Sequence, residues 1–308
     1  MKIVFLDALT LGNDADLRVL GEFGEFISYD TTTLDERLMH IGDAQIVLSN
    51  KVVIDKVIMD ACKNLKLICI TATGMNNVDL EYAKQKGIVV KNVAGYSTAS
   101  VAQATFAHAL ALISSGAYYD AYVKNGNWSK SPIFTHLDKP IFEINRKTWG
   151  IIGLGAIGKE VAKIATAFGA NIVFYSTSGV NNDSLYKRVP LEELMQSDII
   201  SIHAPLNDKT NGLIKKEQLS LMKQGGILLN MGRGGIVDEQ DLALAIDTQD
   251  IFAGLDVMAI EPPASNNPLL HVRRKERLIL SPHVAWASVE ARKTLITMVS
   301  ENIKKFLA

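Results

Sequence analysis

Hydrophobic residues in the first part of the chain form short runs separated by longer, mixed stretches. The runs Lys2–Leu6, Ile46–Ser49, Leu67–Thr71 and Ile88–Lys91 are typical of buried strands. Between them, helices are predicted at Asp14–Phe23, Thr33–Ile41, Asp55–Ala61 and Leu80–Gln85. Strands that alternate with helices favour a parallel sheet. The first third of the chain is therefore predicted to be a small α/β unit.

The stretch Ser97–Ile113 breaks this rhythm and predicts a long helix. Ser100–Gln103 has the sequence of a capping box, which indicates a helix start. The stretch is apolar on almost every side, so the helix is expected to be buried on more than one face. His108 lies within it and is interpreted as a hydrogen-bonded histidine of a core or interface. The segment Asn125–Pro132 that follows has the composition of a loop.

From Thr148 onward the alternation resumes and predicts a second parallel sheet. Its strands are expected at Thr148–Ile152, Asn171–Tyr175, Ile199–His203, Ile227–Met231, Phe252–Val257 and Leu278–Leu280. The last stretch, Ser288–Ala308, is amphipathic and predicts one helix.

Length and composition narrow the class of protein. A chain of 308 residues is too long for one ordinary core, which favours two domains. The formal net charge is −1 and Lys and Arg form no long run, so a nucleic-acid partner is not expected. No apolar run reaches the roughly 18 residues of a membrane span, and Met1–Asp7 lacks the features of a signal peptide.

The two cysteines, Cys62 and Cys69, lie in apolar surroundings and lack the spacing of a zinc site. They are interpreted as buried, reduced residues of a cytoplasmic protein. No metal site is predicted.

The segment Gly153–Gly158 has the pattern Gly-x-Gly-x-x-Gly between a predicted strand and a predicted helix, Lys159–Phe168. In this context Gly153 permits a tight turn, Gly155 lets a pyrophosphate approach the backbone, and Gly158 lets the helix pack against the strand. The phosphates then meet N–H groups at the helix N-terminus. The pattern predicts a dinucleotide cofactor, NAD or NADP.

The end of the second strand of this unit departs from the NAD pattern. An acidic residue is expected there to bind the ribose diol, but the chain continues Ser176-Thr177-Ser178. These hydroxyls could bond a 2′-phosphate, and Lys187 and Arg188 could fold back toward it. Both cofactors therefore stay open, and we expect only modest discrimination between them.

Three further segments follow predicted strands and supply a cation, a carboxylate and an imidazole. Arg233 lies in a glycine-flanked loop, where a guanidinium can hold a carboxylate with two parallel hydrogen bonds. His283 suits proton transfer near neutral pH. Glu261 is its expected partner, because a nearby anion favours the imidazolium, raises its pKa and orients the ring. With a nicotinamide, these groups suffice to reduce a 2-keto acid.

Other strand ends offer weaker candidates. Asp256 could accept a hydrogen bond from the nicotinamide amide, and His203 is interpreted as lining the adenosine side. In the first unit, Gly74 and Met75 could offer backbone N–H groups to a substrate carboxylate, and Lys51 could add positive charge.

Taken in order, these motifs resemble the D-isomer-specific 2-hydroxyacid dehydrogenase family over nearly the whole chain. The matching segments are Gly153–Gly158, His203–Leu206 with Thr210, Asn230–Asp238, Gly254–Pro262 and Ser281–Trp286. The resemblance implies two Rossmann-like or flavodoxin-like α/β domains with a cleft between them. Residues 1–98 and 285–308 would bind substrate, and residues 99–284 would bind NAD(P).

The resemblance also implies roles for single residues. Arg233 would hold the substrate carboxylate, Glu261 would support the histidine, and His283 would be the acid/base. The cofactor contacts that it implies are Ala156, Ile157, His203, Pro205, Thr210, Met231, Gly232 and Asp256, besides the three glycines, Ser176, Arg233 and His283. The helix around 100–114 and the loop after it belong to a homodimer interface in relatives.

Within the family, Ala72–Asp79 and Asn92–Thr98 look most like the glycerate dehydrogenase, or hydroxypyruvate reductase, branch. The expected substrate is hydroxypyruvate or glyoxylate. Two alternatives remain: a dehydrogenase of another D-2-hydroxy acid, such as D-lactate or 3-phosphoglycerate, and a non-catalytic dinucleotide-sensing scaffold of the same fold.

Overall fold

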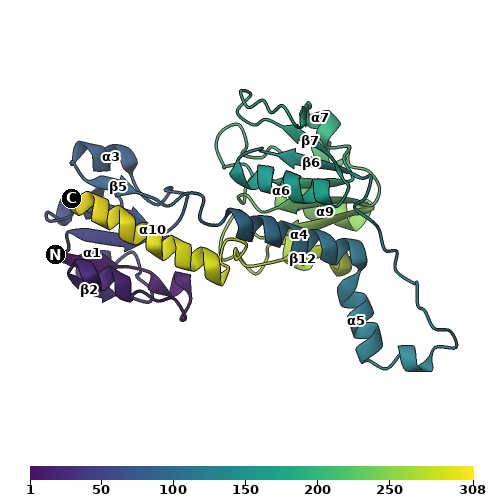
Figure 1. Ribbon diagram of the computed structural model, residues 1–308, viewed down its shortest axis with the longest axis horizontal. Coiled ribbons are helices and arrows are strands. Elements are labelled where there is room, and N and C mark those ends of the chain that lie inside the picture. Colours follow the sequence, from purple (N-terminus) through teal and green to yellow (C-terminus); the bar gives the residue numbers. More distant parts are fainter. The chain divides into compact units, whose positions relative to one another are not determined.

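The computed structural model describes all residues, 1–308, and the chain forms two compact units. Unit 1 comprises Met1–Ser97 and Ala287–Ala308, and unit 2 comprises Thr98–Trp286. Each unit is an α/β fold built on one parallel sheet, shown in Figure 1. The fold class predicted from the alternating pattern is therefore confirmed.

Unit 1 is built on a five-stranded sheet of order β2-β1-β3-β4-β5, in which every pair is parallel. Its strands are β1 (Lys2–Phe5), β2 (Glu25–Ser28), β3 (Ile46–Ser49), β4 (Leu67–Ile70) and β5 (Val89–Lys91). Its helices are α1 (Arg37–Ile41), α2 (Lys56–Ala61), α3 (Leu80–Gln85) and α10 (Val289–Leu307), with short 3₁₀ turns η1 (Ala8–Leu11) and η2 (Arg18–Phe23). The central strands β3 and β4 are buried along their whole length.

Two features of unit 1 differ from the prediction. The helix expected at Asp14–Phe23 is only the 3₁₀ turn η2, which contains Gly21 and ends at Gly24 with φ of +148°. Glycine at these positions disfavours a regular α-helix. Strand β2 was not predicted, because an edge strand with only two apolar residues, Phe26 and Ile27, leaves little hydrophobic signal.

Unit 2 is built on a seven-stranded parallel sheet of order β12-β11-β10-β9-β6-β7-β8. Its strands are β6 (Thr148–Ile152), β7 (Asn171–Tyr175), β8 (Lys187–Arg188), β9 (Ile199–Ile202), β10 (Gly226–Asn230), β11 (Ile251–Leu255) and β12 (Leu278–Leu280). The chain runs outward from β6 in one direction and from β9 in the other. The strand order thus reverses between β6 and β9, where open α/β sheets bind ligands at the carboxyl ends of their strands.

Helices cover both faces of this sheet and bury two hydrophobic clusters. The helices are α4 (Thr98–Ser114), α5 (Gly116–Lys124), α6 (Ala156–Ala167), α7 (Leu191–Leu194), α8 (Lys216–Leu219) and α9 (Glu239–Thr248), with 3₁₀ turns η3 (Trp128–Lys130), η4 (Pro268–His271) and η5 (Lys275–Arg277). Figure 1 shows α4 and α6 side by side on one face, where Phe106 of α4 packs against Trp149 of β6. None of the helices in either unit combines the length and apolar character needed to cross a bilayer.

The start of α4 corrects another prediction. The helix begins at Thr98, so Ser100 lies inside its first turn and is not an N-cap. The Ser100 hydroxyl instead donates to the carbonyl oxygen of Ala285, 2.6 Å away. The capping-box prediction was wrong because a tertiary acceptor takes the serine hydroxyl, which short-range sequence cannot reveal.

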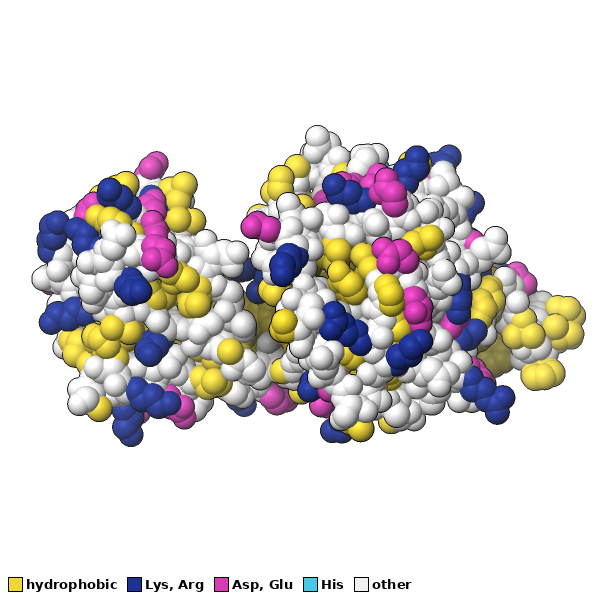
Figure 2. Space-filling model, turned by 90° about the horizontal axis from the view of Figure 1, so that it is seen from above, with side chains coloured by type: hydrophobic (Ala, Val, Ile, Leu, Met, Phe, Trp, Pro, Cys, Tyr) yellow, Lys and Arg dark blue, Asp and Glu magenta, His cyan; other side chains and the backbone are white.

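A projecting arm, defined here as residues 115–147, leaves the body of unit 2 after α4 (Figure 1). Helix α5 within it has no buried residue. Large apolar side chains along the arm are exposed, with Phe134 88% accessible. Figure 2 shows hydrophobic side chains gathered at this end of unit 2. The arm is tied together by the Tyr118 hydroxyl, 2.7 Å from Nε2 of His136, and by Tyr122, whose ring stacks on His136.

Candidate functional site

The glycine-rich loop lies between β6 and α6, as its sequence predicts. Gly153 has φ of +91°, and a Cβ atom there would lie 3.0 Å from the amide nitrogen of Ala204. A Cβ atom on Gly158 would overlap the carbonyl oxygen of Gly153. Gly155 is the N-cap of α6, and a Cβ atom on it would meet nothing within 4 Å. Open space in front of a twelve-residue helix N-terminus suits a pyrophosphate.

His203 follows β9 directly, beside the glycine-rich loop. Part of the residue is accessible, but both ring nitrogens are shielded and have no hydrogen-bond partner in the chain. Burial lowers the pKa of His203 to about 3, so the ring is neutral. Unpartnered buried polar atoms are rare in proteins. Their location at the reversal of strand order fits a dinucleotide, whose polar groups would supply the missing partners.

The loop after β7 contains no carboxylate at the expected ribose position. Ser176 is only 4% accessible, and its hydroxyl accepts a hydrogen bond from the backbone N–H of Asn181 at 3.2 Å. The side chain of Asn181 donates to the carbonyl oxygen of Leu154 in the glycine-rich loop at 2.8 Å. The two loops are thus linked directly.

The two basic residues of β8 point to different partners. Lys187 pairs with Glu193 at 2.8 Å. Nη1 of Arg188 donates to Oδ1 of Asn182 in the loop after β7 at 3.2 Å. Arg188, and not Lys187, therefore contacts the loop after β7 through its side chain.

Arg233 lies in the turn after β10, which is shaped by the buried side chain of Asn230. Oδ1 of the Asn230 side chain accepts from the backbone N–H of Gly232 at 3.1 Å, and its Nδ2 donates to the backbone carbonyl oxygen of Arg233 at 2.9 Å. A Cβ atom on Gly234 would overlap the backbone of Met258, so the turn contacts the chain that leads to Glu261. Arg233 is half-buried and pairs with no carboxylate of the chain.

Glu261 and His283 form a direct pair. Nδ1 of His283 lies 2.7 Å from Oε2 of Glu261, and Oε1 of Glu261 accepts from the backbone N–H of Met258 at 3.0 Å. The carboxylate is thus held in place on one oxygen while the other orients the imidazole. Because Nδ1 of His283 contacts Glu261, Nε2 is the ring nitrogen that remains to bind another group. His283 has φ of +55°, an uncommon conformation for a residue with a side chain.

Asp256, which follows β11 and is 2% accessible, organises the loop that carries His283. Its carboxylate accepts from the backbone N–H groups of Val284 and Ala285, both at 2.9 Å, and from the hydroxyl of Ser281 at 2.6 Å. Its carbonyl oxygen accepts from the N–H of His283 at 2.8 Å. Contact of Asp256 with a nicotinamide amide stays a prediction, and the structure adds this second role.

Comparison with known proteins decides the family. The model for the NAD-binding domain of the D-isomer-specific 2-hydroxyacid dehydrogenases matches residues 106–285. A hydroxypyruvate reductase of Blautia hydrogenotrophica is 39% identical, with 100% of this chain and 97% of the relative aligned. This chain belongs to the D-isomer-specific 2-hydroxyacid dehydrogenase family. The dehydrogenase is therefore an NAD(P)-dependent oxidoreductase.

Two further relatives agree with this assignment. A glycerate dehydrogenase of Methylorubrum extorquens is 38% identical over 100% of this chain and 96% of the relative. An NADPH-dependent glyoxylate/hydroxypyruvate reductase from Sinorhizobium meliloti, solved with NADP and malonate, superimposes with a TM-score of 0.82 at 26% identity, covering 100% and 93% of the two chains. The fold predicted from the sequence is thus the fold of characterised dehydrogenases.

In unit 1 of the dehydrogenase, the sequence-predicted substrate residues follow neighbouring strands. Lys51 follows β3, and its backbone N–H donates to Oδ2 of Asp7 at 2.7 Å. Gly74 and Met75 follow β4 and are partly accessible. Since β3 and β4 are paired in parallel, these segments share the same edge of the unit 1 sheet.

The remaining predicted cofactor residues lie in the loops after β9 and β10 of the dehydrogenase. Thr210 is fully buried, and its hydroxyl donates to the carbonyl oxygen of Pro205 at 2.7 Å. Gly232 packs against the carbonyl oxygen of Ala204, and Met231 is buried before it. Thr210 thus shapes the loop, while cofactor contacts of these residues stay predictions.

Sequence reasoning missed two groups that hold the site together. The carboxylate of Glu239 accepts from the N–H of Ala259 at 2.6 Å and from the side chain of Asn267 at 2.7 Å, which fixes the segment around Glu261. Asn230 shapes the Arg233 turn, as described above. Glu239 directly follows the N-cap Asp238, a position where an acidic residue is ordinary for a helix start. Its sequence context therefore gave no functional signal.

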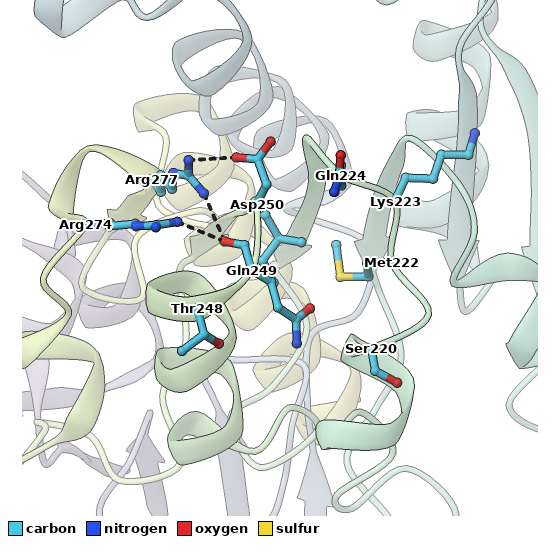
Figure 3. Close-up of a pocket in the computed structure, with 10 residues that line it drawn as sticks. Ser220, Met222, Lys223, Gln224, Thr248, Gln249, Asp250, Arg274 and Arg277 are labelled. Carbon is cyan, nitrogen blue, oxygen red and sulfur yellow. Dashed lines mark hydrogen bonds and ion pairs between the residues drawn. The ribbon is translucent and has the colours of Figure 1, made fainter.

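A cavity of about 690 Å³ lies at the opposite end of the unit 2 sheet of the dehydrogenase, beside the starts of β10 and β11 (Figure 3). Its arginines already have partners, because Arg274 and Arg277 both donate to the carbonyl oxygen of Gln249 and Arg277 pairs with Asp250. These residues cap the end of α9. The cavity contains none of the predicted site residues, and no cluster of His, Cys, Asp or Glu could hold a metal ion.

Proposed function

We propose that this protein reduces a small 2-keto acid, hydroxypyruvate or glyoxylate, to the D-2-hydroxy acid with NADH or NADPH. The observation that carries the proposal is the His283–Glu261 pair at 2.7 Å, in the same unit as an Arg233 side chain that has no carboxylate partner. The names and activities of the two curated relatives support the choice of substrate.

Each residue has a proposed role. A reduced nicotinamide held by the glycine-rich loop would supply the hydride that the reduction of the substrate carbonyl requires. Arg233 binds the substrate carboxylate with its planar guanidinium. His283 donates a proton from Nε2 to the carbonyl oxygen and accepts it back in the reverse reaction. Glu261 holds the ring through Nδ1 and stabilises its charged form.

The other proposed contacts divide between the units. Gly153, Gly155, Ala156, Ile157, Gly158, Ser176, His203, Pro205, Thr210, Met231, Gly232 and Asp256 are proposed to bind the dinucleotide, with Arg233 and His283 beside its nicotinamide. Lys51, Gly74 and Met75 are proposed to bind substrate. Unit 2 is thus proposed as the nucleotide domain and unit 1 as the substrate domain.

Turnover assays with purified protein test the proposal. Loss of reduced-nicotinamide absorbance is followed with NADH and with NADPH against hydroxypyruvate, glyoxylate, pyruvate and 3-phosphohydroxypyruvate. Fastest turnover of hydroxypyruvate or glyoxylate is expected. Faster turnover of pyruvate or the phosphorylated acid would move the assignment to a D-lactate or phosphoglycerate dehydrogenase. Silence with every acid, while cofactor binds, would favour the dinucleotide-sensing scaffold.

We also propose that the enzyme uses both cofactors. Support comes from the missing acidic residue, from the buried Ser176, and from Arg188 at the loop after β7. The ratio of kcat/KM for NADH and NADPH is expected to stay below about a thousandfold, or about 4 kcal/mol. A larger preference for either cofactor would contradict this proposal.

A homodimer through the projecting arm is proposed as well. Its support is the absence of any buried residue in α5 and the exposure of Trp128, Ile133, Phe134 and Leu137. Exposed apolar patches of this kind are typical of interfaces. Sedimentation should give a dimer, and Phe134→Glu should shift it toward monomer. A wild-type monomer at micromolar concentration would contradict the proposal.

A further inference from the structure

Three polar side chains of unit 2 form a chain of hydrogen bonds behind the His283 loop. Ser281 Oγ lies 2.6 Å from Oδ1 of Asp256 and 3.2 Å from Nε2 of His108. Nδ1 of His108 lies 2.9 Å from the carbonyl oxygen of Ala104, one turn earlier in α4. His108 and Asp256 are both buried, with 8% and 2% accessible.

The number of available hydrogens constrains this chain of contacts. A carbonyl oxygen only accepts, so Nδ1 of His108 carries a hydrogen. The hydroxyl of Ser281 has one hydrogen for its two short contacts. If that hydrogen lies on the bond to Asp256, Nε2 of His108 must donate to Ser281. If it lies on the bond to His108, the carboxyl group of Asp256 must supply a hydrogen.

Either arrangement requires one more proton than a carboxylate and a neutral imidazole hold. The surroundings of Asp256 favour the first, because its carboxylate also accepts from the N–H groups of Val284 and Ala285. An ionised carboxylate accepts from all three donors at once. The positive charge of the buried His108 ring is then compensated by the Asp256 carboxylate, with the Ser281 hydroxyl between them. A buried charge requires such a compensating partner.

We propose that His108 is a positioning residue for the loop that carries His283. As a doubly protonated ring, it donates to Ala104 and to Ser281, directs the Ser281 hydroxyl toward Asp256, and thereby fixes the carboxylate that holds Val284, Ala285 and, through its backbone, His283. The proposal deepens the proposed function and rests on it, because the loop it positions carries the proposed proton donor.

The strain at His283 is the reason such support is needed. A residue with a side chain persists at positive φ only where its surroundings hold it. Hydrogen bonds to charged groups are shorter and stronger than neutral ones, and the 2.6 Å between Ser281 Oγ and Asp256 Oδ1 is typical of a hydroxyl that donates to a carboxylate. Loss of the His108 donor should therefore loosen the loop without disturbing the glycine-rich loop.

Two substitutions of His108 separate its two nitrogens. His108→Gln places an amide N–H₂ near the position of Nε2 and keeps a donor to Ser281. His108→Asn places it near Nδ1 and keeps the bond to Ala104 alone. We expect His108→Asn to lower kcat about tenfold, with smaller changes in KM for substrate and in cofactor affinity, and His108→Gln to retain most of kcat.

Two readouts do not depend on turnover. Ring ¹⁵N chemical shifts should show both nitrogens of His108 protonated at neutral pH. Amide hydrogen exchange at Val284 and Ala285 should be faster in His108→Asn than in His108→Gln or wild type. If no keto acid is turned over, the proposed function fails, and these two measurements still decide the role of His108.

A serine variant covers the case in which substitutions inside α4 unfold the protein. Ser281→Ala removes the connecting hydroxyl and should speed exchange at the same two amides. Combining it with His108→Asn should add little, since both act through one path. A neutral His108 ring, unchanged exchange in both single variants, or fully additive effects in the double variant would overturn the proposal.

Discussion

The ends of β1 and β11, one in each unit, use an aspartate in the same way. Asp7, just after β1, accepts from the backbone N–H groups of Asn50, Lys51 and Val52 at 2.8, 2.7 and 3.2 Å. Asp256, just after β11, accepts from the N–H groups of the loop after β12. In both units, a carboxylate at one strand end shapes the loop that follows the neighbouring strand.

The two aspartates differ in what supports them. Asp7 receives backbone N–H groups, and its burial raises the pKa of the carboxyl group. Asp256 receives a serine hydroxyl as well, with His108 behind it. The loop held by Asp256 carries His283 at positive φ. The comparison teaches that a loop with a non-glycine residue at positive φ needs side-chain hydrogen bonds beyond the backbone bonds that suffice elsewhere.

Removing the imidazole should give the largest effect. His283→Ala is expected to lower kcat by about 10²–10⁴-fold, because no other group is proposed to deliver the proton. Cofactor binding should persist, as measured by nicotinamide fluorescence. His271→Ala, at an exposed histidine of the same unit, is the matched control. Full activity of His283→Ala would refute the proton-transfer role.

The second-largest effect is expected on replacing the Asp256 carboxylate, which holds the loop that carries His283. Asp256→Asn places an amide group where Val284, Ala285 and Ser281 all donate, so at least one buried donor loses its partner. Such a loss costs about 1–3 kcal/mol of stability, measured by urea unfolding, and kcat should fall with it. An Asp256→Asn variant with wild-type kcat would show that the loop keeps its shape without the carboxylate.

The same substitution in unit 1 should affect binding instead. Asp7→Asn is expected to raise KM for the keto acid about tenfold while kcat changes less than about threefold, because the loop it shapes carries Lys51, the proposed substrate residue. Steady-state kinetics of the two asparagine variants, side by side, measure this contrast. A loss of kcat with unchanged KM in Asp7→Asn would remove the distinction between the units.

The smallest expected effect is on the pH dependence of stability. The pKa of Asp7 is raised above its ordinary 3.8 by burial, so the folded protein holds this proton more tightly than the unfolded chain. The contribution of Asp7 to stability is therefore greatest below pH 3.8 and declines as pH rises through the raised pKa. The free energy of unfolding of the wild type minus that of Asp7→Asn should therefore decrease as pH rises across this range. A difference that increases with pH would give the opposite sign.

Much of the fold is predictable because buried parallel strands are continuous apolar runs. The strands β3, β6, β7 and β12 have the bounds that the hydrophobic pattern predicts. Strand β8, Lys187–Arg188, was missed because it consists of two charged residues at a sheet edge. Such a strand exists through pairing with β7, which leaves no trace in local composition.

The site is predictable only in part. Arg233, Glu261 and His283 stand out because each follows a strand and carries chemistry, and the structure brings His283 and Glu261 together. The contact between His108 and Ser281 spans 173 residues of sequence. His108 was interpreted as a hydrogen-bonded histidine of a core or interface, and its hydrogen bonds agree with this. No short-range pattern could name Ser281 as its partner.

Substitutions at two glycines of unit 2 should produce opposite kinds of defect in a cell. At Gly234 any side chain would overlap the backbone of Met258, so a substitution there would lower the amount of folded enzyme. At Gly155 a methyl group would meet no protein atom and would instead fill the space in front of α6. A Gly155→Ala allele should thus yield normal quantities of an enzyme that cannot load its dinucleotide, which would separate the presence of the protein from its activity in genetic studies.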